Sequence, residues 1–227
     1  MIGNREAAFK FTLGTEGLLS LVTTDGGNYA SGVAGVGSLI GSKYGVSAAQ
    51  LVAYLDPVVV TAKVMAAITT TTAQAIFMPN YWSSLRCDDL AAGLDLMVCD
   101  HGYNRGPHPS ARVLQRLCGV TLDGWLGDKT IKAANLWANK ATAPAMSADA
   151  TYRLQTRLGV GSDGIIGPKT RAALTATRFP STMLALCRLA DAQLADYRTL
   201  DLFAINGHGW TNRVWNRLGA GLALLPN

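Results

Sequence analysis

An internal repeat constrains the fold of this chain more than any other feature of its sequence. Residues 114–130 recur without a gap 40 residues later as residues 154–170. Each copy reads as the end of a helix, a tight Asp-Gly turn, and a second helix that begins at Pro168 or its equivalent. Two units are too few for a solenoid, so we expect a paired helical module with repeats over 112–135 and 152–175.

Helical patterns dominate the rest of the chain as well. Apolar spacing predicts a helix from 92 to 104 that the pair Gly106-Pro107 ends, and another helix from 184 to 198. The segment 206–209 reads as a turn before a helix from 210 to 218.

Earlier in the chain, the segment Thr71–Gln74 resembles a capping box, which would open a helix that Pro79 ends or bends. Strand signals are limited to one short hairpin within residues 20–40. We therefore expect a mostly α fold.

Glu16 is one of only two glutamates in the 227 residues. Phe9, Leu13 and Glu16 fall at i, i+4 and i+7 of an expected helix, so Glu16 shares the face that turns toward the core. Gly17 is the expected helix stop, which would leave Glu16 at the negative end of the helix dipole. Burial and the dipole would both raise the pKa of this carboxyl group, as a general acid near neutral pH requires.

A Gly-rich loop after this helix carries Asp25, the nearest candidate for a second catalytic carboxylate. Retaining glycosidases hold their two carboxyl groups about 5 Å apart and inverting enzymes roughly 6.5–9.5 Å apart. Sequence spacing across a loop does not distinguish these cases. A single glutamate that is assisted by the substrate, or by a hydroxyl such as that of Thr24, is a further alternative.

Several motifs in order resemble glycoside hydrolase family 108, whose members are N-acetylmuramidases and include many phage endolysins. The resemblance begins at Glu16-Gly17 and covers nearly the whole chain. It departs from the family pattern at Leu18-Leu19, where a second glycine and an aromatic residue are usual, and at Tyr29, where tryptophan is common. The further segments that carry it are 25–32, 37–47, 80–82, 94–106 and 209–214.

This resemblance implies a lysozyme-like catalytic domain over 1–106 in which Glu16 is the acid and Asp25 its partner. The substrate-binding residues that it implies are Tyr29, Tyr44, Tyr81, Trp82 and Asn104. Asn104 lies one helical turn after Asp100, and such a polar pair more often braces a helix than serves a reaction.

The two repeats resemble units of helical peptidoglycan-binding domains, and they define a second region over 107–227. Trp125 occupies the first turn where Ile165 occupies the second. Trp125 is therefore the better candidate for stacking on a sugar ring, although a core position would explain it equally well.

Composition fits a soluble enzyme of the cell wall. The chain is 49% apolar, and its most apolar run, 58–68, is too short for a membrane span and contains Lys63. Residues 1–6 lack the apolar core of a signal peptide. We expect a monomeric lysin that stays in the host cytoplasm until a separate pore-forming protein, a holin, lets it reach the wall or periplasm.

The formal net charge of +5 favours an anionic wall as partner. Lys and Arg form no run and no nucleic-acid-binding motif is visible, so nucleic acid is not expected. The four cysteines lack C-x-x-C spacing, which predicts buried free thiols. Neither a metal nor another cofactor is expected.

Two other classes of function remain open. A zinc-dependent amidase or endopeptidase would draw its ligands from His101, His108 and His208, although these residues show no recognised zinc spacing. A non-catalytic wall-binding virion protein would keep the repeats and lack activity. The combination of Glu16 and Asp25 favours the glycosidase.

Overall fold

The computed structural model describes residues 2–14, 19–141 and 146–226. These residues contain eleven α-helices, so the expected mostly α fold is confirmed. The described residues form no sheet, and three isolated antiparallel bridges join Ser20 to Ser42, Tyr29 to Leu39, and Lys43 to Val46. The expected hairpin is thus reduced to single bridges between loop segments.

The chain forms two compact units, and α1 contributes residues to both. The smaller unit, Phe9–Ser83, has short helices around a long Gly-rich loop. Its core includes Leu51, Met65, Phe77 and Trp82, all of which are buried. Its elements are the end of α1 (Ile2–Leu13), the 3-10 turn η1 (Gly26–Asn28), α2 (Ala48–Leu55), α3 (Ala62–Ala67), α4 (Thr70–Phe77) and the π-helical segment η2 (Met78–Ser83).

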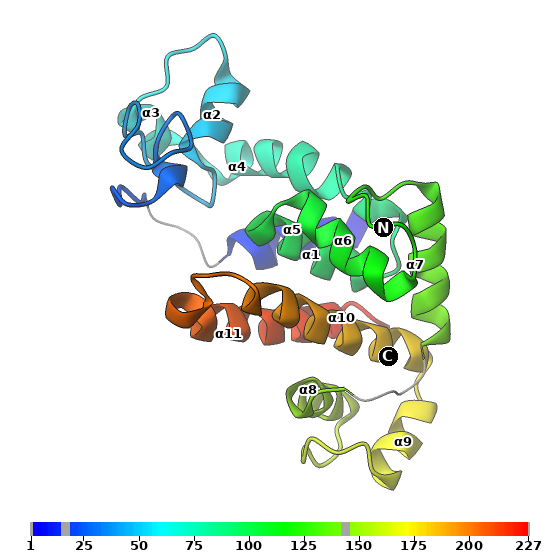
Figure 1. Cartoon of the computed structure of the whole chain (residues 1–227). Coiled ribbons are helices and arrows are strands. Elements are labelled where there is room, and N and C mark those ends of the chain that lie inside the picture. Colours follow the sequence, from blue (N-terminus) through cyan, green and yellow to red (C-terminus); the bar gives the residue numbers. More distant parts are fainter. Residues whose placement is uncertain (1, 15–18, 142–145, 227) are drawn as a thin grey trace. The chain divides into compact units, whose positions relative to one another are not determined.

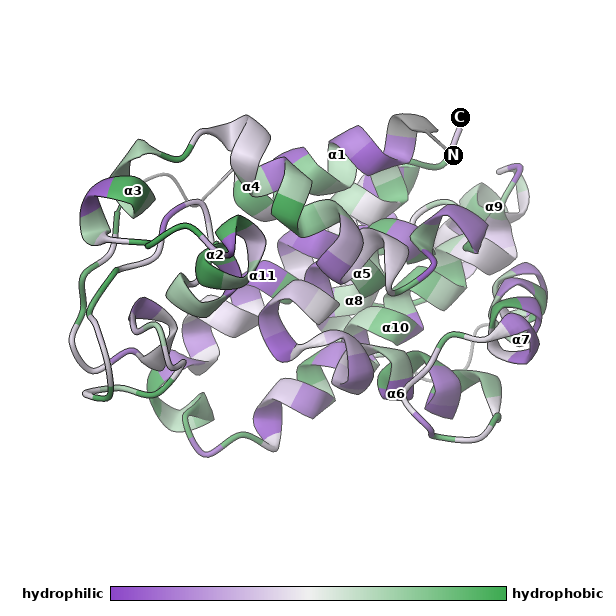
Figure 2. Cartoon of the chain, turned by 90° about the horizontal axis from the view of Figure 1, so that it is seen from above, coloured by the Kyte–Doolittle hydropathy of each residue, from purple (hydrophilic) through white to green (hydrophobic). Residues whose placement is uncertain are grey.

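The larger unit comprises Met1–Ala8 and Ser84–Asn227. Its long helices α10 and α11 pack against each other, and α5, α6 and α8 pack on them (Figure 1). In Figure 2 hydrophilic and hydrophobic residues alternate along these helices, as amphipathic helices around a core require. Its elements are η3 (Cys87–Asp89), α5 (Leu94–Arg105), α6 (Pro107–Cys118), α7 (Asp128–Lys140), α8 (Ala148–Leu158), α9 (Pro168–Thr175), α10 (Pro180–Arg198) and α11 (Phe203–Ala223).

Helix boundaries follow the predicted breaks in some places and not in others. α5 ends at Arg105 and α6 begins at Pro107, as the Gly106-Pro107 pair predicts. The predicted turn at 206–209 is wrong, because α11 is continuous through it. A side chain at Gly207 would lie 2.9–3.0 Å from the ring of Phe203, so the glycine makes room for that ring inside a helix.

The predicted capping box at Thr71 is also misplaced. Thr69 caps α4, because its hydroxyl accepts a hydrogen bond from the backbone N–H of Thr72. In a run of four threonines the sequence does not reveal which hydroxyl begins the helix. Pro79 lies in η2 directly after α4, in agreement with its predicted role.

Among the described helices, none has the length and apolar character that crossing a membrane requires. The predicted boundary between Gly106 and Pro107 lies inside the larger unit, where α5 and α6 pack together. This boundary does not separate two compact units, and it remains a prediction of where the catalytic region ends.

Candidate active site and wall-binding surface

The end of α1 leads toward the predicted acid, Glu16, which lies outside the described residues. Leu13 is buried, and Phe9 meets the ring of Phe77 edge-on with 5.7 Å between centroids, so this face of the helix packs as expected. The helix ends at Leu13 and not at Gly17. Gly14 explains the early end, because its N–H still bonds to Lys10 while any side chain there would collide with the Lys10 carbonyl.

Asp25 is exposed and caps the 3-10 turn η1. Its Oδ1 accepts a hydrogen bond of 2.9 Å from the backbone N–H of Gly27. A side chain with this role fixes the start of the turn. The other carboxylate oxygen accepts no hydrogen bond within the described part of the chain, so it is available to solvent or substrate.

Asn28 organises the loop around Asp25 from a fully buried position. Its side-chain Nδ2 donates to the carbonyl of Val22 at 2.9 Å and to the hydroxyl of Ser20 at 3.3 Å. Its backbone carbonyl accepts hydrogen bonds from the backbone N–H groups of Ile40 and Gly41, each at 2.9 Å. Asn28 thereby joins the two sides of the Gly-rich loop, and the bonds from Nδ2 are the ones that require an amide side chain.

Tyr29 and Tyr44, two of the predicted substrate contacts, both take part in holding this loop. Tyr29 is buried and its hydroxyl donates to the carbonyl of Thr23 at 3.1 Å. Tyr44 is half-buried in the left-handed region at φ +50°, and Lys43 Nζ lies 4.9 Å from the centre of its ring. Lys43 also donates to the carbonyls of Ala66 and Ile68 at 2.6 and 3.0 Å, which ties the loop to the end of α3.

Tyr81 and Trp82 lie together in η2 but differ in accessibility. Tyr81 is half-buried, and its hydroxyl accepts a hydrogen bond of 2.6 Å from Gln50 Nε2 on α2. Trp82 is fully buried, and its indole N–H has no hydrogen-bond partner among the described residues. Of these two predicted contacts, Tyr81 alone has surface to offer a sugar in this conformation.

A buried ion cluster joins two motifs that are far apart in the sequence. Asp100 on α5 is fully buried and pairs with Arg213 at 2.7 Å and with Arg217 at 2.6 Å, both on α11. Burial raises the pKa of the Asp100 carboxyl, but the two guanidinium groups outweigh this effect and bring the pKa to about 2. Asp100 therefore stays ionised, and it secures α5 against α11.

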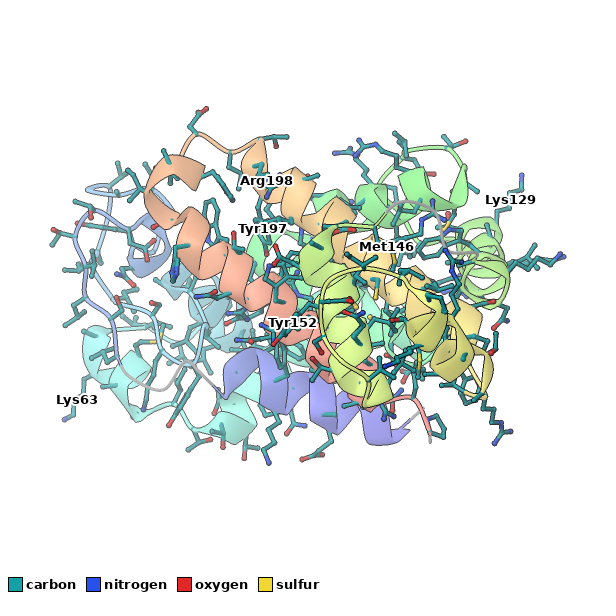
Figure 3. The ribbon with its side chains drawn as sticks, turned by 90° about the horizontal axis from the view of Figure 1, so that it is seen from below. Lys63, Lys129, Met146, Tyr152, Tyr197 and Arg198 are labelled. Carbon is teal, nitrogen blue, oxygen red and sulfur yellow. The ribbon has the colours of Figure 1, made fainter. Side chains whose placement is uncertain are left out.

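The cluster extends into a layer of polar and aromatic side chains. Arg217 donates to Gln193 Oε1 at 2.8 Å and to the hydroxyl of Tyr197 at 3.2 Å. Tyr197 lies between the helices of the larger unit (Figure 3) and stacks on Trp210 with 5.4 Å between ring centroids. All three guanidinium nitrogens of Arg217 thus donate a hydrogen bond, as a buried charge requires, and these bonds join α11 to α5 and α10.

Asn104, another predicted substrate contact, is exposed at the end of α5. Its amide donates to the backbone carbonyl of Asp100 at 2.7 Å. This is the bracing contact that the one-turn spacing predicts.

The cluster also includes the buried imidazole of His101. Its Nε2 lies 3.5 Å from Asp196 Oδ2, and Asp196 in turn pairs with Arg105 at 2.6 Å. Burial lowers the pKa of His101 to about 4, against the opposing effect of Asp196. His101 is therefore neutral near pH 7.

The two repeats have the same hydrogen-bond network in their Asp-Gly turns. In the first, buried Gln115 donates through Nε2 to Asp123 at 2.6 Å and to the carbonyl of Trp125 at 2.9 Å, and its Oε1 accepts from the N–H of Gly124. In the second, the corresponding residues Gln155, Asp163, Ile165 and Gly164 repeat these bonds at 2.7, 2.9 and 2.9 Å. The glutamine and the turn residues of the motif therefore have a structural explanation.

Trp125 does not belong to the core, since 63% of it is exposed. The surface alternative for this residue is thus the correct one. Ile165, its counterpart, is similarly exposed.

The residues considered for zinc do not assemble. His101 contacts Asp196, His108 contacts Gly124 and Trp125, and His208 contacts Asn212. No group of three or more metal-ligating side chains occurs in residues 2–14, 19–141 and 146–226. The cysteines are free thiols, of which Cys118 is half-buried while Cys87, Cys99 and Cys187 are buried.

The described residues have a mostly α fold, and comparison with known proteins shows which family part of the chain resembles. The family model of glycosyl hydrolase 108 matches residues 9–106, which include Glu16 and Asp25. Residues 9–106 thus resemble a glycosyl hydrolase 108 domain, and this match supports a glycoside hydrolase that acts on peptidoglycan.

The whole chain is also similar to a solved structure. SagA from Brucella abortus superposes with a TM-score of 0.67 at 26% identity, and the match covers 100% of this chain and 98% of that chain. No curated protein sequence matches the chain.

The partners of Asp100 are not evident from the sequence. Arg213 belongs to the motif that carries the resemblance, but its pairing with Asp100 spans 113 positions. The i, i+4 spacing of Arg213 and Arg217 on one helix was the available signal, because two cations on a packed face require an anion.

Proposed function

We propose that this protein is an N-acetylmuramidase that cleaves the β-1,4 bond between N-acetylmuramic acid and N-acetylglucosamine. The observation that carries the proposal is the family match over residues 9–106, because it includes both the Glu16 motif and the Asp25 loop. In this mechanism Glu16 protonates the leaving glycosidic oxygen while positive charge develops on the sugar ring.

Two features of the described residues support the proposal. The loop around Asp25 is ordered by the buried Asn28, and it leaves the Asp25 carboxylate exposed to solvent. Tyr81 lies half-buried in the same compact unit. A carboxylate and an aromatic ring are the groups that a glycosidase uses to stabilise and bind a sugar.

The proposal is tested with the variant Glu16→Gln. An amide of the same volume cannot donate the proton, so cleavage of purified peptidoglycan should fall by at least about 10²-fold while the circular dichroism spectrum is retained. Glu6→Gln is the matched control, since Glu6 is the other glutamate and is exposed on α1. Full activity in a folded Glu16→Gln protein would contradict the assignment.

Mass spectrometry of the products tests the bond. New reducing ends on N-acetylmuramic acid support the muramidase. Anhydro-muramic ends would indicate a transglycosylase, and free peptide stems would indicate an amidase.

A further inference from the structure

The two repeats have the same turn but different side chains on its outer surface. In the first repeat His108 and Arg112 lie one turn apart on α6 and flank Gly124. A Cβ built on that glycine would lie 3.2 Å from His108 Cβ and 3.3 Å from Arg112 Nε. Trp125 follows directly. We call His108, Arg112 and Trp125 the Trp125 platform.

His108 holds the indole of Trp125 in place. Their ring centroids are 4.3 Å apart with 75° between the planes, so the edge of one ring meets the face of the other. His108 Nδ1 lies 3.0 Å from the carbonyl oxygen of Gly124. A carbonyl only accepts, so Nδ1 carries the proton and Nε2 is left for a ligand.

Arg112 supplies a cation beside this ring. Its side chain is exposed, and it makes no hydrogen bond or ion pair within the described residues. The hydrogen bonds that Asp123 Oδ1 accepts from the N–H of Trp125 and from Gln115 lower the pKa of this carboxyl, and the charge of Arg112 adds to the effect. Asp123 is therefore an acidic neighbour of Arg112 that does not hydrogen-bond to it. The planar guanidinium of Arg112 is thus available for the two-point binding of a carboxylate.

The second repeat has none of these groups at the corresponding positions. Ala148 replaces His108, Tyr152 on α8 replaces Arg112 (Figure 3), and Ile165 replaces Trp125. The turn geometry is the same, with φ of +82° at Gly124 and +75° at Gly164. Turn structure therefore does not account for the three residues of the platform, and the second repeat provides an internal control.

We propose that the Trp125 platform binds a muramyl-peptide unit of peptidoglycan, with the sugar ring on Trp125 and a carboxylate of the peptide stem on Arg112. A pyranose offers an apolar face to an indole, and the stem adds the negative charge that Arg112 recognises. The proposal rests on peptidoglycan as the substrate of the proposed muramidase. It assigns to the first repeat a specificity that the second repeat lacks.

The test uses the full chain and a soluble GlcNAc-MurNAc-peptide monomer as probe. This disaccharide lacks the MurNAc-GlcNAc bond of the proposed function, so the enzyme does not consume it. Binding is followed by NMR at the indole N–H signal of Trp125, which Trp125→Phe identifies. We expect a saturable shift with this probe and a much weaker one with chitotetraose, which is neutral.

Variants then assign the contacts. Trp125→Ala should weaken binding of the monomer about three- to tenfold, as loss of one aromatic contact does. Arg112→Gln should weaken it by about tenfold and remove the preference over chitotetraose, whereas Arg112→Lys should restore part of it. Ile165→Ala is the matched control and should bind as the native protein does.

Equal affinity for the two probes, or native affinity in Arg112→Gln, would overturn the proposal even if cleavage of the polymer is normal. Conversely, a platform that binds the monomer in a protein whose products show no muramidase cleavage would overturn the proposed function and leave this inference standing. Near-native melting temperatures of the variants establish that lost binding is not lost folding.

Discussion

At the scale of single residues, substitutions of Asp25 can distinguish a catalytic role of its charge from a structural role of its hydrogen bond. The hydrogen bond that its side chain accepts from the N–H of Gly27 is a cap that asparagine makes about as well. We expect Asp25→Asn to melt within a few degrees of the native protein while kcat on peptidoglycan falls by about 10²-fold or more, if the charge stabilises the transition state.

Asp25→Ala removes the cap too, and it should cost about 1 kcal/mol of stability in addition. Native kcat in Asp25→Asn would make Asp25 a structural residue of the loop. A second group, such as the hydroxyl of Thr24, would then be the one to examine.

His101 predicts how stability depends on pH. Its pKa is about 4 in the folded protein, below the ordinary value of 6.5, because burial disfavours the imidazolium. Between these values the unfolded chain binds the proton that the folded protein does not. Stability should therefore be complete above pH 6.5 and decline as the pH falls toward 4, by roughly 3 kcal/mol from this group.

Urea unfolding at several pH values between 4 and 7 measures this decline. His101→Gln should flatten it, whereas His208→Gln, at an exposed position on α11, should leave it unchanged. An unchanged slope in His101→Gln would contradict the assignment. The Asp100 carboxyl changes stability mainly below this window, because its contribution is lost as the pH falls from its ordinary pKa of 3.8 toward its folded pKa of about 2.

At the scale of secondary-structure elements, the local sequence is sufficient to predict a turn or a helix end where glycine or proline marks it. The repeat turns, the break between α5 and α6, and the position of Pro79 all follow from such residues. The continuous helix α11 does not, because the ring of Phe203 lies against Gly207 one turn later on the same helix and leaves no room for a side chain there. Propensity alone reads the same residues as a turn.

Gly124 gives the element-scale prediction. Its φ is +82°, and a side chain would press on His108 and Arg112, so Gly124→Ala should destabilise the protein by about 1–3 kcal/mol. Gly127, three residues later, has φ −73° and open space around its Cβ position. Gly127 is the N-cap of α7, where alanine is less favourable than glycine, so Gly127→Ala should cost at most about 1 kcal/mol without any steric strain. Thermal unfolding of both variants checks the difference.

At the scale of the whole molecule, the sequence indicated which motifs matter but not how they combine. The motifs that carry the resemblance include Asp100 and Arg213, but they do not reveal the ion pair between these residues, since that contact depends on how α5 packs against α11. The sequence does not decide whether Trp125 lies at the surface or in the core, because an indole suits both environments. Its exposure depends on the packing of the first repeat, which local sequence does not encode.

The net charge of +5 gives the last prediction. If the basic surface draws the protein to an anionic wall, retention on purified sacculi should weaken with salt, because the Debye length falls from about 30 Å at 0.01 M to about 3 Å at 1 M. Retention on chitin, which is uncharged, should change little. Sedimentation of the Glu16→Gln protein with each polymer measures binding without cleavage. Retention on sacculi that does not respond to salt would show that stacking and hydrogen bonds, and not the overall charge, hold the enzyme on its substrate.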